Sequence, residues 1–152
     1  MEKEQLEEIA IHFRQAIVAA KENREFNHRD RMNSFPVGCC DDSADLFSHY
    51  LYQKYRIIST RVDGSYHDGN PEHSCNHSWQ EVDGLVIDLT GSQFKYNPIF
   101  LYYDKDVYVG TKEKFHNMFK VERSEPCKGI KDLGQRSWDR MFDLYSRILK
   151  YC

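Results

Sequence analysis

The residues with the clearest chemical potential lie in the middle of the chain, where the sequence predicts a β-hairpin around Asp83-Gly84. Asp-Gly tolerates the positive φ angles of a two-residue type I′ turn, and the segments on both sides alternate in polarity. This turn places Val82 opposite Leu85, and the two-residue period of a strand then puts His77 and Asp88 on one face as diagonal neighbours. An imidazole and a carboxylate at that separation can share a hydrogen bond. The hairpin therefore predicts a base and the acid that orients it.

A cysteine nucleophile is available upstream of this pair. The loop of residues 35–40 contains proline and glycine and runs directly into a helical pattern, so Cys39 or Cys40 falls at a helix N-terminus. The partial positive charge at this end of a helix favours a thiolate, whereas Asp41 and Asp42 oppose one. In the thiol form of the catalytic triad, the base activates the sulfur and the acid fixes the base. The order cysteine, histidine, aspartate therefore predicts a catalytic triad.

Four motifs resemble the papain-like and transglutaminase-like cysteine enzymes, particularly the small bacterial ones. The resemblance covers residues 35–94 and implies Cys40 as nucleophile, His77 as general base and Asp88 as orienting acid. Cys39 departs from the pattern, which has one cysteine where this chain has two. The motifs are Phe35-Pro36-Val37-Gly38-Cys39-Cys40, His77-Ser78-Trp79-Gln80-Glu81-Val82-Asp83-Gly84, Ile87-Asp88-Leu89-Thr90 and Gln93-Phe94.

Four other residues are predicted to support the site or to bind substrate. Cys39 would shape the loop beside the nucleophile, and Gln93 would support the site from behind. Trp79 shares a face with His77 and would either shield the His–Asp pair from water or act as a core aromatic residue. Asn33 precedes the nucleophile, a position from which a polar side chain can help to form an oxyanion hole.

The predicted function is acyl transfer by a cysteine enzyme that hydrolyses a peptide or isopeptide amide bond through a thioester. Hydrolysis of a protein or peptide substrate is favoured over transfer to an acceptor, because a small single domain leaves little room for a dedicated acceptor site. Three alternatives remain open: a transglutaminase or glutamine deamidase acting on a protein, an arylamine-type acyltransferase, and a catalytically silent protein-binding module on the same scaffold.

No metal and no other cofactor is predicted. The run His73-Ser74-Cys75-Asn76-His77 alternates imidazole and thiol groups, but it lacks the paired ligand spacings of common structural zinc sites.

Length and composition predict one domain over residues 1–152, a size that buries about two-thirds of the unfolded surface. Charged residues of both signs make up 30% of the chain and give a net charge of -3, which argues against nucleic acid as a partner. No apolar run approaches the length of a membrane span, and no signal peptide is visible. The five cysteines suit reduced thiols, so a cytoplasmic location is expected, with leaderless secretion of an effector as the alternative. The sequence does not predict an oligomeric state.

An α+β fold should position these residues. Apolar spacing predicts helices over residues 4–22, 40–54 and 135–150, and a short helix over 112–119. Strands are predicted over residues 55–62, on both sides of the Asp83-Gly84 turn, and in a second hairpin over 99–103 and 107–109. No element is assigned to residues 120–133. The expected fold is a papain-like or transglutaminase-like core, in which the nucleophile-bearing helix packs on an antiparallel sheet of about four to five strands, with flanking helices.

Overall fold

The hairpin around Asp83-Gly84 lies within the sheet of this protein, whose computed structural model describes all residues from 1 to 152. Strand β2 (Cys75–Val82) pairs with β3 (Leu85–Asp88), and Val82 lies opposite Leu85 as predicted. Asp83 and Gly84 have φ angles of 51° and 79°, which are those that a type I′ turn requires. The predicted register of the central hairpin is confirmed.

Three further strands complete the antiparallel sheet. Strand β1 (Ser59–Tyr66) pairs with β2, and β5 (Lys120–Cys127) pairs with the other side of β1. Strand β4 (Tyr108–Gly110) pairs with β3. The strand order is therefore β4-β3-β2-β1-β5, with β5 at one edge.

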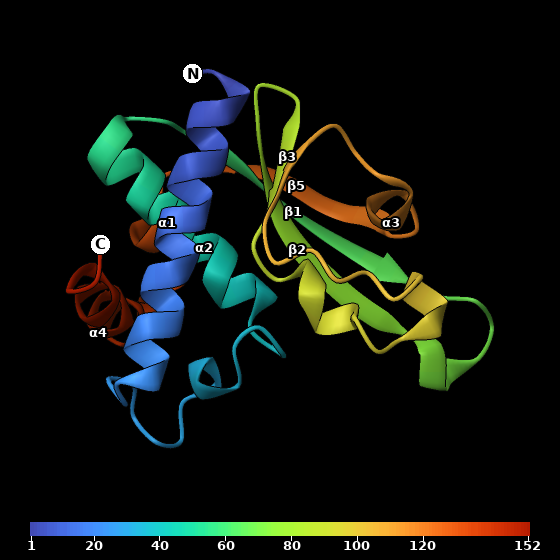
Figure 1. The fold of residues 1–152 in the computed structure, drawn as a ribbon, viewed down its shortest axis with the longest axis horizontal. Helices are drawn as coiled ribbons and strands as arrows, with labels where there is room; N and C mark the ends of the chain where they lie inside the picture. The colour runs from blue at the N-terminus through green and yellow to red at the C-terminus, as the bar shows by residue number, and fades with distance from the viewer.

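Helices cover the two faces of the sheet unequally. Helices α1 (Lys3–Glu22), α2 (Cys40–Tyr55) and α4 (Trp138–Leu149) gather on one side, whereas the single turn of α3 (Lys114–Asn117) lies on the other side (Figure 1). The protein thus has an α+β fold in which helices pack on a five-stranded antiparallel sheet. None of its helices combines the length and the apolar character that crossing a bilayer requires.

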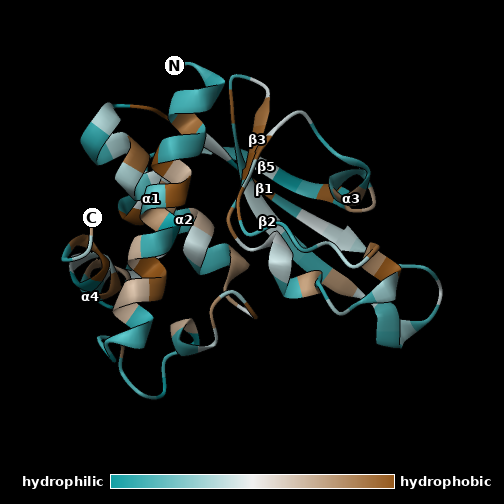
Figure 2. Cartoon of the chain, in the orientation of Figure 1, coloured by the Kyte–Doolittle hydropathy of each residue, from teal (hydrophilic) through white to brown (hydrophobic).

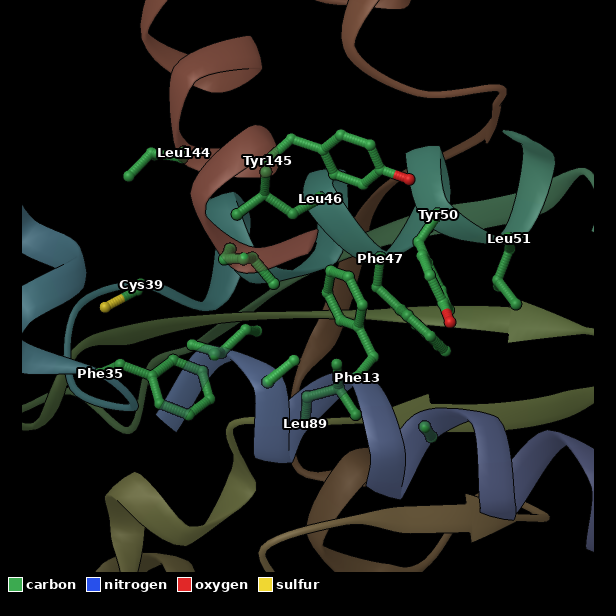
Figure 3. Close-up of a cluster of buried hydrophobic side chains, with 14 of the residues drawn as sticks. Phe13, Phe35, Cys39, Leu46, Phe47, Tyr50, Leu51, Leu89, Leu144 and Tyr145 are labelled. Carbon is green, nitrogen blue, oxygen red and sulfur yellow. The ribbon is translucent and has the colours of Figure 1, made fainter. Parts of the chain in front are cut away.

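Each face of the sheet has its own hydrophobic core. Apolar and polar bands alternate along α1, as a helix with one buried stripe should show (Figure 2). Its Phe13 packs against Phe47 and Tyr50 of α2 in the larger core (Figure 3). The smaller core, on the other face, is mainly aromatic and consists of Val62, Trp79, Val86, Phe94, Phe100, Tyr103, Phe115 and Phe119.

The predicted strand over residues 99–103 is wrong. Residues Pro98–Phe100 form a short 3-10 helix whose start is capped by Asn97, with its side-chain oxygen accepting from the Ile99 N–H. Leu101 and Tyr102 then adopt positive φ angles of 61° and 52°, which no strand allows. The apolar run was misleading because only part of it is buried, and β4 pairs with β3 instead.

Strand β5 lies where no element was predicted. All of its residues except Cys127 are exposed, so it has no alternation of buried and exposed positions that the sequence could reveal. Charged side chains and Pro126 are typical of an edge strand, where they discourage pairing with another chain. The predicted strand over 55–62 also begins later, because α2 continues to Tyr55 and ends at Arg56 in the left-handed conformation.

Candidate active site

His77 and Asp88 form a hydrogen-bonded pair inside the smaller core. The Nε2 atom of His77 lies 2.8 Å from Oδ2 of Asp88, and both side chains are fully buried. The pair arises from the hairpin register, which places the two residues on the same face of neighbouring strands. The predicted contact between them is confirmed.

The surroundings of Asp88 fix the roles of the two imidazole nitrogens. Oδ1 of Asp88 accepts a hydrogen bond from the Thr90 N–H at 3.0 Å, which leaves Oδ2 to accept from the Nε2–H of His77. The Nδ1 atom of His77 is then the nitrogen that can take up a proton. It lies 3.4 Å from Nε2 of Gln93. Gln93 therefore contacts His77 directly, which agrees with its predicted supporting role.

Charge holds this pair together despite its burial. Burial by itself would lower the pKa of His77, but the charge of Asp88, the hydrogen bond to Asp88 and the nearby Cys40 thiol raise it to about 9. Burial likewise opposes ionisation of Asp88, yet the charge of His77 and the hydrogen bonds that the carboxylate accepts hold its pKa below the usual range. An imidazolium–carboxylate pair is therefore favoured near neutral pH.

Aromatic rings surround the His77 imidazole. The ring centroid of Trp79 lies 5.7 Å from that of His77, and those of Phe94, Phe115 and Phe119 lie 5.2 to 5.5 Å away. Trp79 is only 1% exposed and also packs within the smaller core, so it both fills the core and shields the pair from water. Excluding water strengthens the electrostatic interaction between His77 and Asp88.

Cys40 is the first residue of α2 and lies in an open groove. The groove has a volume of about 610 Å³ and runs between the start of α2 and strands β1, β2 and β5. The Cys40 thiol is half-buried and lies close enough to His77 to raise the pKa of the imidazole. No direct hydrogen bond of ordinary length and angle joins the sulfur to the ring, so the hydrogen bonds of the site connect His77 to Asp88 and Gln93 only. The groove is lined by Gly38, Cys40, Asp41, Arg61, Asp63, Gly64, Cys75, Asn76, Ser78, Gln93 and Glu122.

Cys39, by contrast, belongs to the larger core. Its side chain is fully buried beside Phe35 (Figure 3), and its sulfur lies 3.1 Å from the backbone oxygen of Val37 and 3.3 Å from that of Arg31. Burial and neighbouring negative charge raise the pKa of this thiol to about 12. Cys39 therefore shapes the loop before α2, and Cys40 is the accessible thiol of the two.

The carboxylate of Asp42 does not face the thiols as a free charge. Arg31 and Arg140 each donate two hydrogen bonds to it, at distances between 2.6 and 3.1 Å. Burial raises the pKa of Asp42, but these two guanidinium groups outweigh burial and lower it. The opposition of Asp42 to a thiolate is thus largely neutralised by Arg31 and by Arg140 of α4, which lies 98 residues away along the chain, whereas Asp41 still lines the groove that contains Cys40.

The structure places Asn33 away from the groove. Its Nδ2 atom donates to the backbone oxygens of Asn27, at 2.7 Å, and Asp30, at 3.3 Å, so the side chain braces its own loop. The prediction that Asn33 is an oxyanion donor is therefore wrong. Position in the sequence suggested this role, but the 3-10 turn Arg31–Ser34 directs the amide back along the chain.

A second histidine, missed in the sequence, binds the same carboxylate. Nε2 of His116 lies 2.9 Å from Oδ2 of Asp88, and the His116 side chain is fully buried. His116 belongs to α3 and lies 28 residues from Asp88 along the chain, so no local spacing connects the two. The one signal in the sequence for this contact is that His116 lies within an otherwise apolar helix face.

The histidines and cysteine of the run 73–77 do not converge. His73 is partly exposed and pairs with Asp68 at 2.7 Å, whereas His77 is buried against Asp88. The Cys75 sulfur lies 3.4 Å from the backbone oxygen of its neighbour Asn76. No group of three or more histidine, cysteine or acidic side chains is arranged to hold a metal ion.

No family model matches the chain, and no curated protein or solved structure matches it either. The motif resemblance over residues 35–94 therefore stays a prediction.

Proposed function

We propose that this protein is a cysteine enzyme that transfers acyl groups, with a papain-like or transglutaminase-like arrangement of Cys40, His77 and Asp88. The observation that carries the proposal is the buried His77–Asp88 pair beside a groove that contains an accessible thiol at a helix N-terminus. Each group has the surroundings that its role requires, since the acid is ionised, the base is oriented and the nucleophile is reachable. Hydrolysis of a peptide or isopeptide amide is the proposed reaction, and the open groove suits an extended protein or peptide substrate.

The proposed reaction has two stages. Because His77 is held as an imidazolium, Cys40 reacts as the thiolate beside it: the sulfur attacks the carbonyl carbon, and Nδ1 of His77 gives its proton to the leaving amine as the C–N bond breaks. A thioester with Cys40 remains. Water attacks the thioester while the neutral His77 takes a proton from it, and the C–S bond breaks to release a carboxylic acid and to restore the Cys40 thiolate beside the His77 imidazolium. Asp88 stabilises that imidazolium in both stages.

Two groups are proposed to stabilise the negative charge on the substrate oxygen. The backbone N–H of Cys40 lies at the first position of α2, where a helix has no internal acceptor for it. The side-chain amide of Gln93 lines the same groove and can donate a second hydrogen bond. Its contact with Nδ1 of His77 holds the amide next to the place where the carbonyl would lie.

An acyl-enzyme should form with a simple activated ester. Mixing the protein with p-nitrophenyl acetate should release a burst of p-nitrophenolate and leave about one acetyl group per chain, which hydroxylamine removes because the bond is a thioester. Intact-mass spectrometry and peptide mapping would locate the acetyl group on Cys40. The Cys40→Ala variant should show no burst, and the Cys39→Ala variant should retain it.

A catalytically silent binding module is the competing proposal. It is favoured by the lack of a direct hydrogen bond between the Cys40 sulfur and His77, and by the Gln93 amide that contacts Nδ1. Under this alternative, p-nitrophenyl acetate would acetylate exposed amines slowly and without a burst, and Cys40→Ala would change nothing.

A further inference from the structure

We propose that His116 is a positioning residue of this site, which acts on His77 through the Asp88 carboxylate that the two histidines share. The inference rests on the proposed function, because it assigns His116 a role in the same chemistry. It goes beyond a Cys–His–Asp arrangement, since it adds a second imidazole, from a different element of the fold, that determines how the acid holds the base.

Three hydrogen-bond donors hold the carboxylate of Asp88. Oδ2 of Asp88 lies 2.8 Å from Nε2 of His77 and 2.9 Å from Nε2 of His116, while Oδ1 accepts from the Thr90 N–H at 3.0 Å. These donors come from β2, from α3 and from the segment directly after β3. A carboxylate held in this way has little freedom to rotate, so the imidazole of His77 is held in one orientation too.

A histidine is energetically unfavourable at position 116 unless it forms the hydrogen bond to Asp88. His116 is 1% exposed, and its Nδ1 atom is buried without any hydrogen-bond partner. Its ring packs between aromatic rings, with centroids 5.2 Å from Trp79, 5.8 Å from Tyr103 and 5.5 Å from Tyr108. A phenylalanine would fill such a space and leave no polar atom unsatisfied. The hydrogen bond to Asp88 is the interaction that accounts for a histidine here.

The second donor also limits how strongly Asp88 holds the proton of His77. A carboxylate oxygen that accepts two hydrogen bonds shares its charge between them, so His116 weakens the attraction between Asp88 and the imidazolium of His77. Removing His116 should therefore make His77 more basic and less firmly oriented. The titratable and charged groups near Asp88 and His116 are His77, Arg14, Tyr103, Tyr108 and Glu113, and all of them remain when only His116 is changed.

The test compares His116→Phe, which keeps the packing and removes the donor, with His116→Gln, whose side-chain N–H₂ can occupy the position of Nε2. The pKa of His77 would be followed by NMR of protein labelled at histidine, and acylation by p-nitrophenyl acetate would be followed as a function of pH. His116→Phe should raise the pKa of His77 by about one unit, the scale of one hydrogen bond to a charged group, and slow acylation about tenfold or more. His116→Gln should restore both values towards those of the unmutated protein.

Failure of this proposal is distinguishable from failure of the proposed function. If the unmutated protein forms no acyl-enzyme, the proposed function fails, while the NMR titration still shows whether His116 acts on His77. An unchanged pKa of His77 in folded His116→Phe would overturn the inference. If His116→Phe does not fold, His116→Leu removes the same donor and takes its place: a raised pKa of His77 in His116→Leu that His116→Gln restores supports the inference, and an unchanged pKa in His116→Leu overturns it. Loss of the fold in His116→Gln, or a pKa shift as large as that expected for phenylalanine, would reduce His116 to a structural role.

Discussion

Replacing Asp88 by alanine is expected to destabilise the protein by about 3–5 kcal/mol and to slow acyl transfer about 10²–10⁴-fold. The substitution leaves two fully buried imidazoles without the carboxylate that accepts from both. It also removes the group that fixes the tautomer of His77 and stabilises its charged form. Urea denaturation followed by tryptophan fluorescence would measure the stability, and the p-nitrophenyl acetate burst would measure the rate.

Asp104→Ala is the matched control, because Asp104 is an exposed aspartate. It should change the free energy of unfolding by no more than about 0.5 kcal/mol and leave the burst intact. A loss in Asp88→Ala that is no larger than in Asp104→Ala would show that the buried pair does not hold the site together.

The contribution of the pair should also depend on pH. Asp88 has a lowered pKa when folded, so its contribution is present above the unfolded value of about 3.9 and is lost as the pH falls. His77 has a raised pKa of about 9, so its contribution is complete below the unfolded value of about 6.5 and is lost as the pH rises through about 9. The stability difference between the unmutated protein and Asp88→Asn should therefore be widest between about pH 4 and 6.5 and narrow towards pH 9.

Gly129→Ala is expected to cost about 2–6 kcal/mol of stability for two separate reasons. Gly129 has φ 132° and ψ -151°, a conformation that only glycine adopts readily. A Cβ atom there would also lie 2.8 Å from both Cα and Cβ of His49, and closer still to its ring nitrogen Nδ1. His49 cannot move away easily, since its ring packs 4.6 Å from that of Tyr145 and its Nδ1 accepts from the Ile130 N–H.

Substitutions at two other glycines distinguish the cost of backbone strain from the cost of the close contact with His49. Gly69 has φ 94° and would meet no atom within 4 Å, so Gly69→Ala should show the backbone strain alone, about 1–3 kcal/mol. Gly134 has φ -59° and an equally open site, so Gly134→Ala should stay within about 0.5 kcal/mol of the unmutated protein. If Gly129→Ala loses no more stability than Gly69→Ala, the close contact with His49 is not a constraint on this fold.

The central hairpin and its His77–Asp88 contact could be predicted because a two-residue turn fixes the register of both strands. The choice of Cys40 over Cys39 could be made only from the motif resemblance and from its place at the helix start, because both positions can be continued onto the buried stripe of α2. In the structure, Gly38 at φ 71° ends the loop and Cys39 turns into the larger core, and this burial leaves Cys40 as the accessible thiol.

The parts that could not be predicted depend on contacts between distant segments. Arg140 reaches Asp42 across 98 residues, and His116 reaches Asp88 across 28. Strand β5 is stabilised by pairing with β1 rather than by an apolar face of its own, so its composition resembles that of a loop. In the segment 99–103, the turn formed around Asn97 and Pro98 outweighed the strand-like composition that follows it.

Alkylation of the protein with iodoacetamide at graded pH tests the central claim most directly, because it reports an activated thiol without any knowledge of the substrate. One thiol should react fast below neutral pH, where an ordinary cysteine, with a pKa of about 8.5, reacts slowly. Cys40→Ala should abolish this fast reaction, Cys39→Ala should leave most of it, and His77→Ala should move its onset to higher pH. Fast labelling that is lost in Cys39→Ala but kept in Cys40→Ala would contradict the assignment of the nucleophile, and uniformly slow labelling of the unmutated protein would contradict the enzyme itself.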